Sequence, residues 1–178
     1  GTEEWFGWSY TFGNNYIADK EHNWVFFQSH EGTVGTSPLI SMQVLGHRDG
    51  EISLVNASQS GPNNTYINTG VRPTAGETVD IVLHIIWGDE SNGLLQLWMN
   101  GNKVYDAQVR TVRATTNVGG NAKFGIYYSD WRSASGVQAS AQQGISDIET
   151  FMGPLRMILR RPSDSDYRKD SYSEVAPD

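Results

Sequence analysis

The chain alternates between apolar runs of strand length and clusters of Gly, Asn, Ser and Pro, which is typical of an all-β domain. From Val79 to Trp87 both alternating faces are largely apolar, as expected of a central strand that is buried on both sides. Asn100-Gly101 separates two strand-like runs, and both residues tolerate the positive φ of a tight type I′ turn. We therefore predict a β-hairpin over Leu94 to Val109.

The same pattern predicts seven further strands: Trp5 to Phe12, Trp24 to Gln28, Leu39 to Leu45, Ile52 to Asn56, Tyr66 to Val71, Ala122 to Tyr128 and Leu155 to Arg160. So many strands in 178 residues predict a two-sheet sandwich or jelly roll rather than an α/β enzyme. Residues 129–148 are rich in Ser, Ala, Gly and Gln, and we predict a long loop there. We expect one domain over residues 1–161, with a polar tail over 162–178 that packs on it.

Composition excludes several classes of protein. No apolar run is long enough for a transmembrane helix. Cysteine is absent, which rules out disulfides, thiolate nucleophiles and Cys-ligated zinc. The net charge of -7 argues against a general nucleic-acid binder, but it leaves room for a local basic cleft. The chain begins at Gly1 rather than Met, so we expect a processed or trimmed form that a signal peptide could have preceded.

The segment NWVFFQSHEG runs from an apolar strand directly into Gln28, Ser29 and His30. His30 precedes Glu31-Gly32, an expected turn, which places it at a sheet rim that a substrate can reach. Histidine changes its charge near neutral pH and suits acid-base chemistry. The alternative is a structural histidine at a strand end. For His84, which lies in mid-strand among apolar neighbours, packing within the sheet is the default interpretation.

In NAKFGIYYSDW, alternation places Lys123, Gly125 and Tyr127 on one face of a strand. A glycine within a strand often permits close approach of a ligand, so this face could hold an anion beside a proton donor. An ordinary solvent-facing surface would show the same pattern. No nucleophile elbow, P-loop, dinucleotide fingerprint, HExxH or EF-hand motif is present, and no pair of carboxylates can be placed across a cleft.

Together these segments resemble the heparin lyase I-like and glucuronan lyase-like polysaccharide lyases. The similarity spans nearly the whole chain and keeps the family's order in the segments EEWFGWSYTFGNNY, FFQSHEG, ETVDIVLHIIW, LLQLWMNGNKVYD, NAKFGIYYSDW and SYSEVAPD. The sequence departs from the family pattern at Glu31, since relatives often have Gly directly after the histidine. Relatives also carry further residues, including a charged strand, upstream of the position of Gly1.

The resemblance implies a concanavalin A-like β-jelly roll, a two-sheet antiparallel sandwich with a concave groove. The groove would bind a uronic-acid polysaccharide such as glucuronan, alginate or heparin, which is cleaved by β-elimination without a cofactor. A structural calcium ion occurs in relatives, and the sequence assigns no ligands to one. Carried over by motif, His30 is the proton-abstracting or charge-stabilising histidine, Gln28 the carboxylate-binding amide, Lys123 the groove lysine and Tyr127 the catalytic tyrosine.

The chemistry of β-elimination accounts for these residue types. The proton next to an ionised carboxylate is weakly acidic, so Gln28 and Lys123 would stabilise the charge that develops there. His30 or Tyr127 then takes the C5 proton, and Tyr127 protonates the departing glycosidic oxygen. Trp131 and Arg132 would form a groove wall, and His84 is a further candidate that could reach the groove floor.

Two other interpretations remain open at this point. The same fold could be a non-catalytic glycan-binding module, since fold does not determine function. A structural interaction domain would lack a groove enriched in Lys, His and Tyr. We expect a secreted or periplasmic monomer with no nucleic-acid or membrane partner, because a polysaccharide is too large to import.

Overall fold

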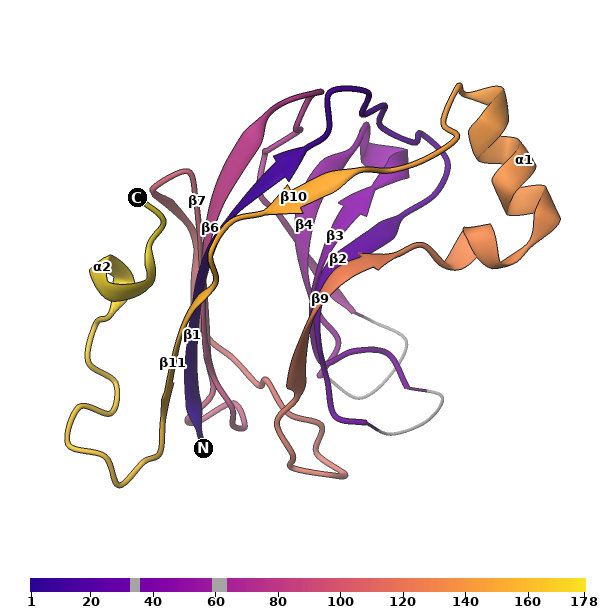
Figure 1. Ribbon diagram of the computed structural model, residues 1–178. Helices are drawn as coiled ribbons and strands as arrows, with labels where there is room; N and C mark the ends of the chain where they lie inside the picture. The colour runs from indigo at the N-terminus through magenta and orange to yellow at the C-terminus, as the bar shows by residue number, and fades with distance from the viewer. Residues whose placement is uncertain (33–35, 59–63) are drawn as a thin grey trace.

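The computed structural model describes residues 1–32, 36–58 and 64–178, which form two antiparallel sheets facing each other (Figure 1). Sheet A has the order β10 (Thr150–Met152), β1 (Glu3–Phe12), β6 (Thr78–Ile86), β7 (Leu94–Met99) and β8 (Asn102–Gln108), and β11 (Arg156–Arg160) also pairs with β1. Sheet B has the order β5 (Thr65–Asn68), β4 (Glu51–Asn56), β3 (Ile40–Leu45), β2 (Trp24–His30) and β9 (Asn121–Tyr127). The predicted all-β jelly-roll sandwich is confirmed.

The core lies between the sheets and is rich in aromatic rings. Alternate residues of β1, among them Phe6, Trp8 and Tyr10, point toward sheet B and are almost fully buried. Tyr10 stacks on Phe26 at 4.7 Å, and Trp8 meets Phe124 edge-on at 5.3 Å between ring centroids. Each such ring removes a large apolar area from water, so these contacts fix how the two sheets sit on each other.

The strand predictions hold to within a few residues, and Asn100 and Gly101 have the positive φ values, 50° and 80°, that a hairpin turn needs. The predicted strand from Tyr66 ends earlier, at Asn68. The predicted loop over 129–148 is wrong, because it contains η2 (Ser129–Arg132) and α1 (Ala134–Gln142). Helix α1 has few apolar residues and no visible period, and it begins where Ser133 Oγ accepts a hydrogen bond from the Gly136 N–H at 3.1 Å. Strand β10 has three residues, too few for a pattern.

The C-terminal residues lie against the outer side of sheet A (Figure 1). The short helix α2 (Tyr172–Val175) buries Val175 against Trp5 and Trp98. Another short helix, η1 (Gly46–Arg48), follows β3. Among the described residues, no helix is long and apolar enough to cross a membrane.

One long side of the sandwich is open. In the described part of the chain β9 pairs only with β2, so β9 is an edge strand. On sheet A, Met157 and Leu159 lie opposite Phe6 and Glu4, on the inner face, yet they are 47% and 53% exposed. Ile126 on β9 is also exposed. Sheet A therefore extends past the edge that β9 forms.

Candidate active site

A register shift between β2 and β9 shapes the candidate site. Gln28 lies directly opposite Lys123, and Val25 lies opposite Tyr127, but β9 has one residue more than β2 between these pairs. The bulge falls at Gly125, whose φ of 138° is unfavourable for any residue with a side chain. Strand β2 is irregular at the same place, since its register against β3 also shifts between Val25 and Phe27. Phe26 and Phe27 therefore both enter the core, while Lys123 and Tyr127 lie on the outer face of sheet B, the face that points away from sheet A.

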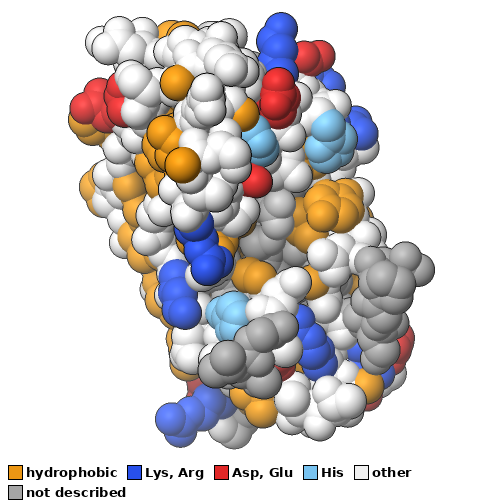
Figure 2. Space-filling model, turned by 90° about the vertical axis from the view of Figure 1, so that its right-hand side faces the viewer, with side chains coloured by type: hydrophobic (Ala, Val, Ile, Leu, Met, Phe, Trp, Pro, Cys, Tyr) orange, Lys and Arg blue, Asp and Glu red, His pale blue; other side chains and the backbone are white. Residues whose placement is uncertain are grey.

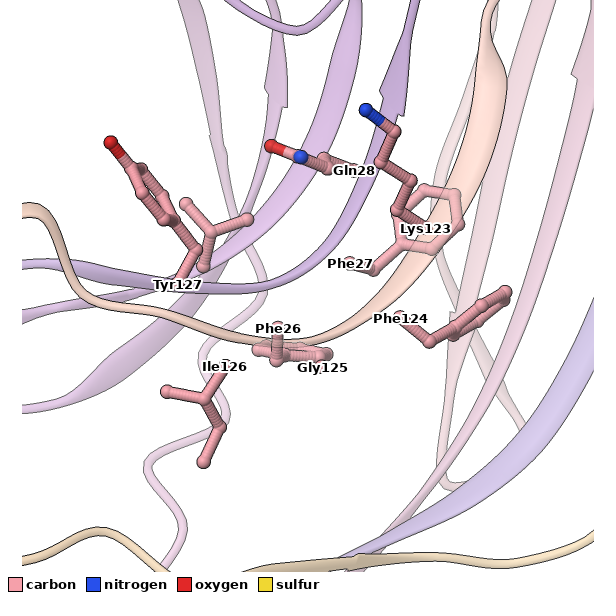
Figure 3. A pocket seen from close by; sticks show the side chains of 9 residues that line it. Phe26, Phe27, Gln28, Lys123, Phe124, Gly125, Ile126 and Tyr127 are labelled. Carbon is pink, nitrogen blue, oxygen red and sulfur yellow. The ribbon is translucent and has the colours of Figure 1, made fainter.

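A small cavity of about 110 Å³ brings three of the predicted residues together between β2 and β9. Figure 3 shows the side chains of Tyr127, Gln28 and Lys123 rising on the same side of the strands, whereas Phe124 and Ile126 point the other way. Tyr127 is 48% exposed and Lys123 is also exposed. The aromatic and polar groups on this face are therefore accessible to a ligand.

The polar groups of this cavity have no partners within the described residues. Neither the Gln28 amide nor the Lys123 ammonium nor the Tyr127 hydroxyl makes a hydrogen bond or ion pair there. A cation, an amide and a phenol are all hydrogen-bond donors, so the cavity presents donors to whatever occupies it. Because the protein as a whole is acidic, this grouping favours an anionic or hydroxyl-rich ligand at this place.

His30 lies on the same face two residues beyond Gln28, opposite Asn121 and outside the cavity lining. The backbone N–H of Gly32 donates to His30 Nδ1 at 2.9 Å, and Nε2 lies 3.0 Å from the Thr36 carbonyl oxygen. A backbone N–H can only donate and a carbonyl can only accept, so these contacts suit the tautomer in which Nδ1 accepts and Nε2 donates. In this arrangement the lone pair of His30 is already occupied.

An ion pair lies close in sequence to Gly32 and Thr36, the two residues that contact His30. Arg113 pairs with Glu31 and also donates from Nη2 to the Ser37 carbonyl at 2.6 Å, and Thr116 donates to Glu31 at 2.9 Å. Glu31 is the position at which the sequence departs from the family pattern. Its carboxylate joins the end of β2 to the connection between β8 and β9, next to the backbone groups that bind the His30 ring.

The centre of the outer face has a low floor. Ser41, Ser53 and Val55 point away from the core, since they alternate with core residues, and yet they are 2%, 0% and 2% exposed. Neighbouring groups therefore cover these three side chains on the outer face. Figure 2 looks onto this side of the molecule and shows a hollow bordered by His and Lys or Arg side chains. This is consistent with the groove expected of the fold.

The prediction that His84 reaches the groove is wrong. His84 lies on β6 of sheet A, and its ring faces the outer side of that sheet. It stacks on Trp5 at 3.7 Å and is hydrogen-bonded to Gln96 at 2.7 Å and Glu3 at 2.8 Å. Burial lowers the pKa of His84 despite these two partners. Sequence alternation shows which residues share one face of a strand. It does not show in which sheet the strand lies, or whether that face points to the core or to the outside.

Trp131 and Arg132 lie in η2, directly after β9, at the foot of α1. Trp131 is half-buried, donates from Nε1 to Ser140 Oγ at 2.8 Å and packs on Tyr128 at 4.7 Å, while Arg132 is exposed. Figure 1 shows η2 and α1 projecting beyond sheet B on the side of its outer face. The two residues thus belong to a projection beside Tyr127, as a groove wall requires. The indole N–H of Trp131, however, donates to Ser140 within this projection and is not available to a ligand.

Sequence reasoning missed the residue that anchors this projection. Asp19 is 1% exposed and accepts hydrogen bonds from the Tyr128 hydroxyl, from Ser140 Oγ at 2.9 Å and from Gln143 Nε2 at 3.0 Å. The N–H groups of Glu21 and His22 also donate to it. Burial alone would raise the pKa of Asp19, but these hydrogen bonds outweigh burial and hold the pKa far below its usual range. Nothing in the sequence around Asp19 signals this role.

No three His, Asp or Glu side chains converge as metal ligands within the described ranges. The donor set of the cavity, an amide, an ammonium and a phenol, is also unsuited to calcium, which takes oxygen ligands such as carboxylates and carbonyls. The described side chains thus provide neither a carboxylate cluster nor a cavity suited to calcium, and the structural calcium ion that the family resemblance allows stays a prediction.

Several solved structures share this fold. An endo-β-1,4-glucuronan lyase from the fungus Trichoderma reesei superposes with a TM-score of 0.63 and 15% identity, over 87% of this chain and 67% of that one. An alginate lyase from Pseudomonas aeruginosa gives 0.62 and 14%, over 89% and 65%. A variant of alginate lyase Aly36B in complex with alginate trisaccharide gives 0.60 and 20%, over 90% and 72%. The chain thus spans about two thirds of the length of these enzymes. No curated protein matches it significantly.

These likenesses establish a jelly-roll fold shared with a glucuronan lyase and with alginate lyases. The family is established separately, since the polysaccharide lyase family model matches residues 1–149, most of the chain. The chain belongs to the polysaccharide lyase family.

Proposed function

We propose that the protein cleaves a polysaccharide containing uronic acid by β-elimination at the cavity between β2 and β9. The observation that carries this proposal is the convergence of Gln28, Lys123 and Tyr127 on one exposed face, with all three polar groups unpartnered in the described structure. The similarity to glucuronan and alginate lyases supports the same substrate class. Glucuronan and the alginates are the polymers to test first.

In the proposed reaction Lys123 and Gln28 bind the carboxylate of the sugar whose C5–H bond breaks. Removing this weakly acidic proton builds up negative charge on the carboxylate, and the two donors stabilise that charge. The electron pair of the C–H bond forms the C4–C5 double bond, and the C4–O bond breaks to release the glycosidic oxygen. Tyr127 Oη, the exposed phenol oxygen of the cavity, takes the C5 proton and then delivers it to the departing glycosidic oxygen.

The geometry supports proton transfer by Tyr127 rather than by His30 in the proposed reaction. His30 has no free lone pair, because Gly32 and Thr36 occupy both ring nitrogens. About five strand residues, roughly 16 Å along β2, separate His30 from the position opposite Tyr127. In the proposed complex the sugar ring lies above Gln28 between these two side chains. His30 then bounds the site and contributes a polar edge.

The test is the ultraviolet absorbance of the unsaturated uronate product on glucuronan, polymannuronate, polyguluronate, heparin and hyaluronan. The wild-type protein should produce it on at least one polymer, and Tyr127→Phe should lower kcat by at least about 10²-fold while leaving polymer binding intact. His30→Asn should retain most of the activity that Tyr127→Phe loses.

Binding of a polymer without any unsaturated product would replace the lyase with a glycan-binding module on the same face. Activity that survives in Tyr127→Phe and vanishes in His30→Asn would reverse the assignment of the two residues. We further propose that the protein acts outside the cytoplasm, since its substrate is a polymer.

A further inference from the structure

The outward side chains of sheet B form two rows that run across its five strands. The register places one residue of each strand in the first row: Lys123, Gln28, Ser41, Val55 and Tyr66. It places one residue of each strand in the second row: Tyr127, Val25, Gln43, Ser53 and Asn68. Both rows begin at the reactive groups on β9 and end on β5, the opposite edge of the sheet.

The two ends of these rows are exposed, whereas three residues between them are covered. Ser41, Ser53 and Val55 are nearly inaccessible, whereas Tyr66 is 48% exposed and Asn68 is also exposed. The side chains of Tyr66 and Asn68 make no hydrogen bond with any other described residue. An aromatic ring and an amide are thus exposed and unpartnered at the edge of sheet B opposite the cavity.

The spacing of the strands relates this end to the length of a sugar chain. Neighbouring strands lie about 4.8 Å apart, close to the length of one pyranose unit in an extended 1,4-linked chain. Three strand steps, from β2 through β3 and β4 to β5, separate Gln28 from Tyr66. A polysaccharide lying along the rows therefore reaches Tyr66 about three sugar units from the unit whose carboxylate meets Gln28.

Building on the proposed function, we propose that Tyr66 and Asn68 form a distal sugar subsite that makes the protein favour long uronate chains over short ones. The ring of Tyr66 packs against the C–H face of a pyranose, as exposed aromatic rings do with apolar surfaces. The amide of Asn68, two residues along the same strand, donates to and accepts from the hydroxyl or carboxylate groups of that sugar. The subsite adds affinity only for chains that are long enough to reach β5.

The experiment compares uronate oligosaccharides of three to six units, made from whichever polymer the protein accepts. For wild type, kcat/KM should rise with each added unit. Tyr66→Ala should lower kcat/KM on the hexasaccharide about fivefold and leave the trisaccharide unchanged, and Tyr66→Phe should behave as wild type because the stacking ring remains. Asn68→Ala should show a smaller loss with the same dependence on length. Phe151→Ala removes an equally exposed ring from β10 of sheet A and serves as the matched control.

A second readout separates this proposal from the proposed function. Calorimetric titration of oligosaccharides into Tyr127→Phe, with and without Tyr66→Ala, measures binding without cleavage. If binding strengthens with oligosaccharide length only when Tyr66 is present, and wild type cleaves none of the oligosaccharides, the subsite is upheld and the lyase is rejected. If wild type cleaves the oligosaccharides and Tyr66→Ala lowers kcat/KM equally at all lengths, or not at all, the subsite is rejected and the lyase is kept. A protein that neither binds nor cleaves any uronate oligomer would overturn both.

Discussion

Lys123 is the cation of the candidate site, and its surroundings leave its charge available. It is exposed and has no ion-pair partner in the described ranges, unlike Lys103, which pairs with Asp106 at 2.8 Å on the other sheet. An unpaired lysine on an exposed strand contributes little to folding, because even paired surface charges contribute only about 0–1 kcal/mol. Its placement opposite Gln28 is therefore better explained by ligand binding than by stability.

We predict that Lys123→Ala lowers kcat/KM on the preferred uronate polymer by about 10²-fold, the usual loss when one charge-stabilising group is removed. The midpoint of thermal unfolding should not change, since Lys123 has no partner to lose. Lys123→Arg should recover part of the activity, and Lys103→Ala should leave it unchanged. A fall in thermal stability that parallels the fall in rate would contradict this assignment.

The hydrogen bonds of His30 make a prediction that does not depend on any substrate. In ¹⁵N NMR spectra at neutral pH, the His30 ring should be the neutral tautomer with the proton on Nε2, because Gly32 donates to Nδ1 and Thr36 accepts from Nε2. His47, which is exposed and forms no hydrogen bond through its ring within the described residues, provides the comparison in the same spectrum. A ring with its proton on Nδ1 and a lone pair on Nε2 would instead return His30 to the role of a catalytic base.

The sequence indicated which residues to examine as the candidate site, but not how the fold would arrange them. Gln28, Lys123 and Tyr127 were predicted from motif and alternation, and the structure brings them together at one cavity. The occupied lone pair of His30 depends on backbone groups of Gly32 and Thr36, whose positions follow from the turn after β2 and cannot be deduced from residue types. His84 was misplaced for a similar reason, since its partner Glu3 is 81 positions away.

At the scale of elements, Asp19 joins three separate segments of the chain. It receives hydrogen bonds from the residue after β9 and from α1, and these partners lie more than 100 positions along the chain. The strand pattern revealed β9, but a serine-rich and alanine-rich helix whose position depends on a distant carboxylate leaves no periodic trace. The projection beside Tyr127 therefore depends on a contact that local sequence cannot reveal.

We predict that Asp19→Asn lowers the free energy of unfolding by about 2 kcal/mol near neutral pH, because an amide cannot accept all of these hydrogen bonds. The folded-state pKa of Asp19 is lowered, so its contribution is complete above the unfolded pKa of about 3.9 and is lost as pH falls below that value. The difference between wild type and Asp19→Asn, measured by denaturant unfolding, should stay constant from about pH 5 to 8 and shrink in more acidic solution.

The matched control is Asp147→Asn, an exposed aspartate near the end of the same connection, which should change the free energy of unfolding by less than about 0.5 kcal/mol. If the wild-type and Asp19→Asn curves differ equally at pH 3 and pH 7, the ionised carboxylate is not the origin of the effect. Loss of activity on uronate polymers without loss of stability would instead point to a direct role of Asp19 in the site.

At the scale of the whole molecule, alternation and the absence of cysteine were enough to predict a packed all-β sandwich. They could not give the order of the strands. That order places β9 beside β2 although 90 residues separate the end of one from the start of the other, and the site exists only because of this pairing. The open side of the sandwich was equally hidden, because Met157 and Leu159 alternate as core residues do and only the extent of sheet B leaves them exposed.

Net charge sets a further property of the whole molecule. Twenty acidic and 13 basic residues give a charge of -7, so the protein and a uronate polymer repel each other at long range while Lys123 attracts the polymer at contact. The Debye length falls from about 30 Å at 0.01 M salt to about 8 Å at 0.15 M, and this removes long-range repulsion before it weakens a short contact. We predict that kcat/KM on polymer rises with sodium chloride up to about 0.15 M and falls beyond it. In Lys123→Ala, kcat/KM should still rise up to about 0.15 M sodium chloride but should not fall beyond it. A steady decline of the wild-type kcat/KM from the lowest salt concentration would contradict the prediction, because it would show that local attraction outweighs long-range repulsion throughout.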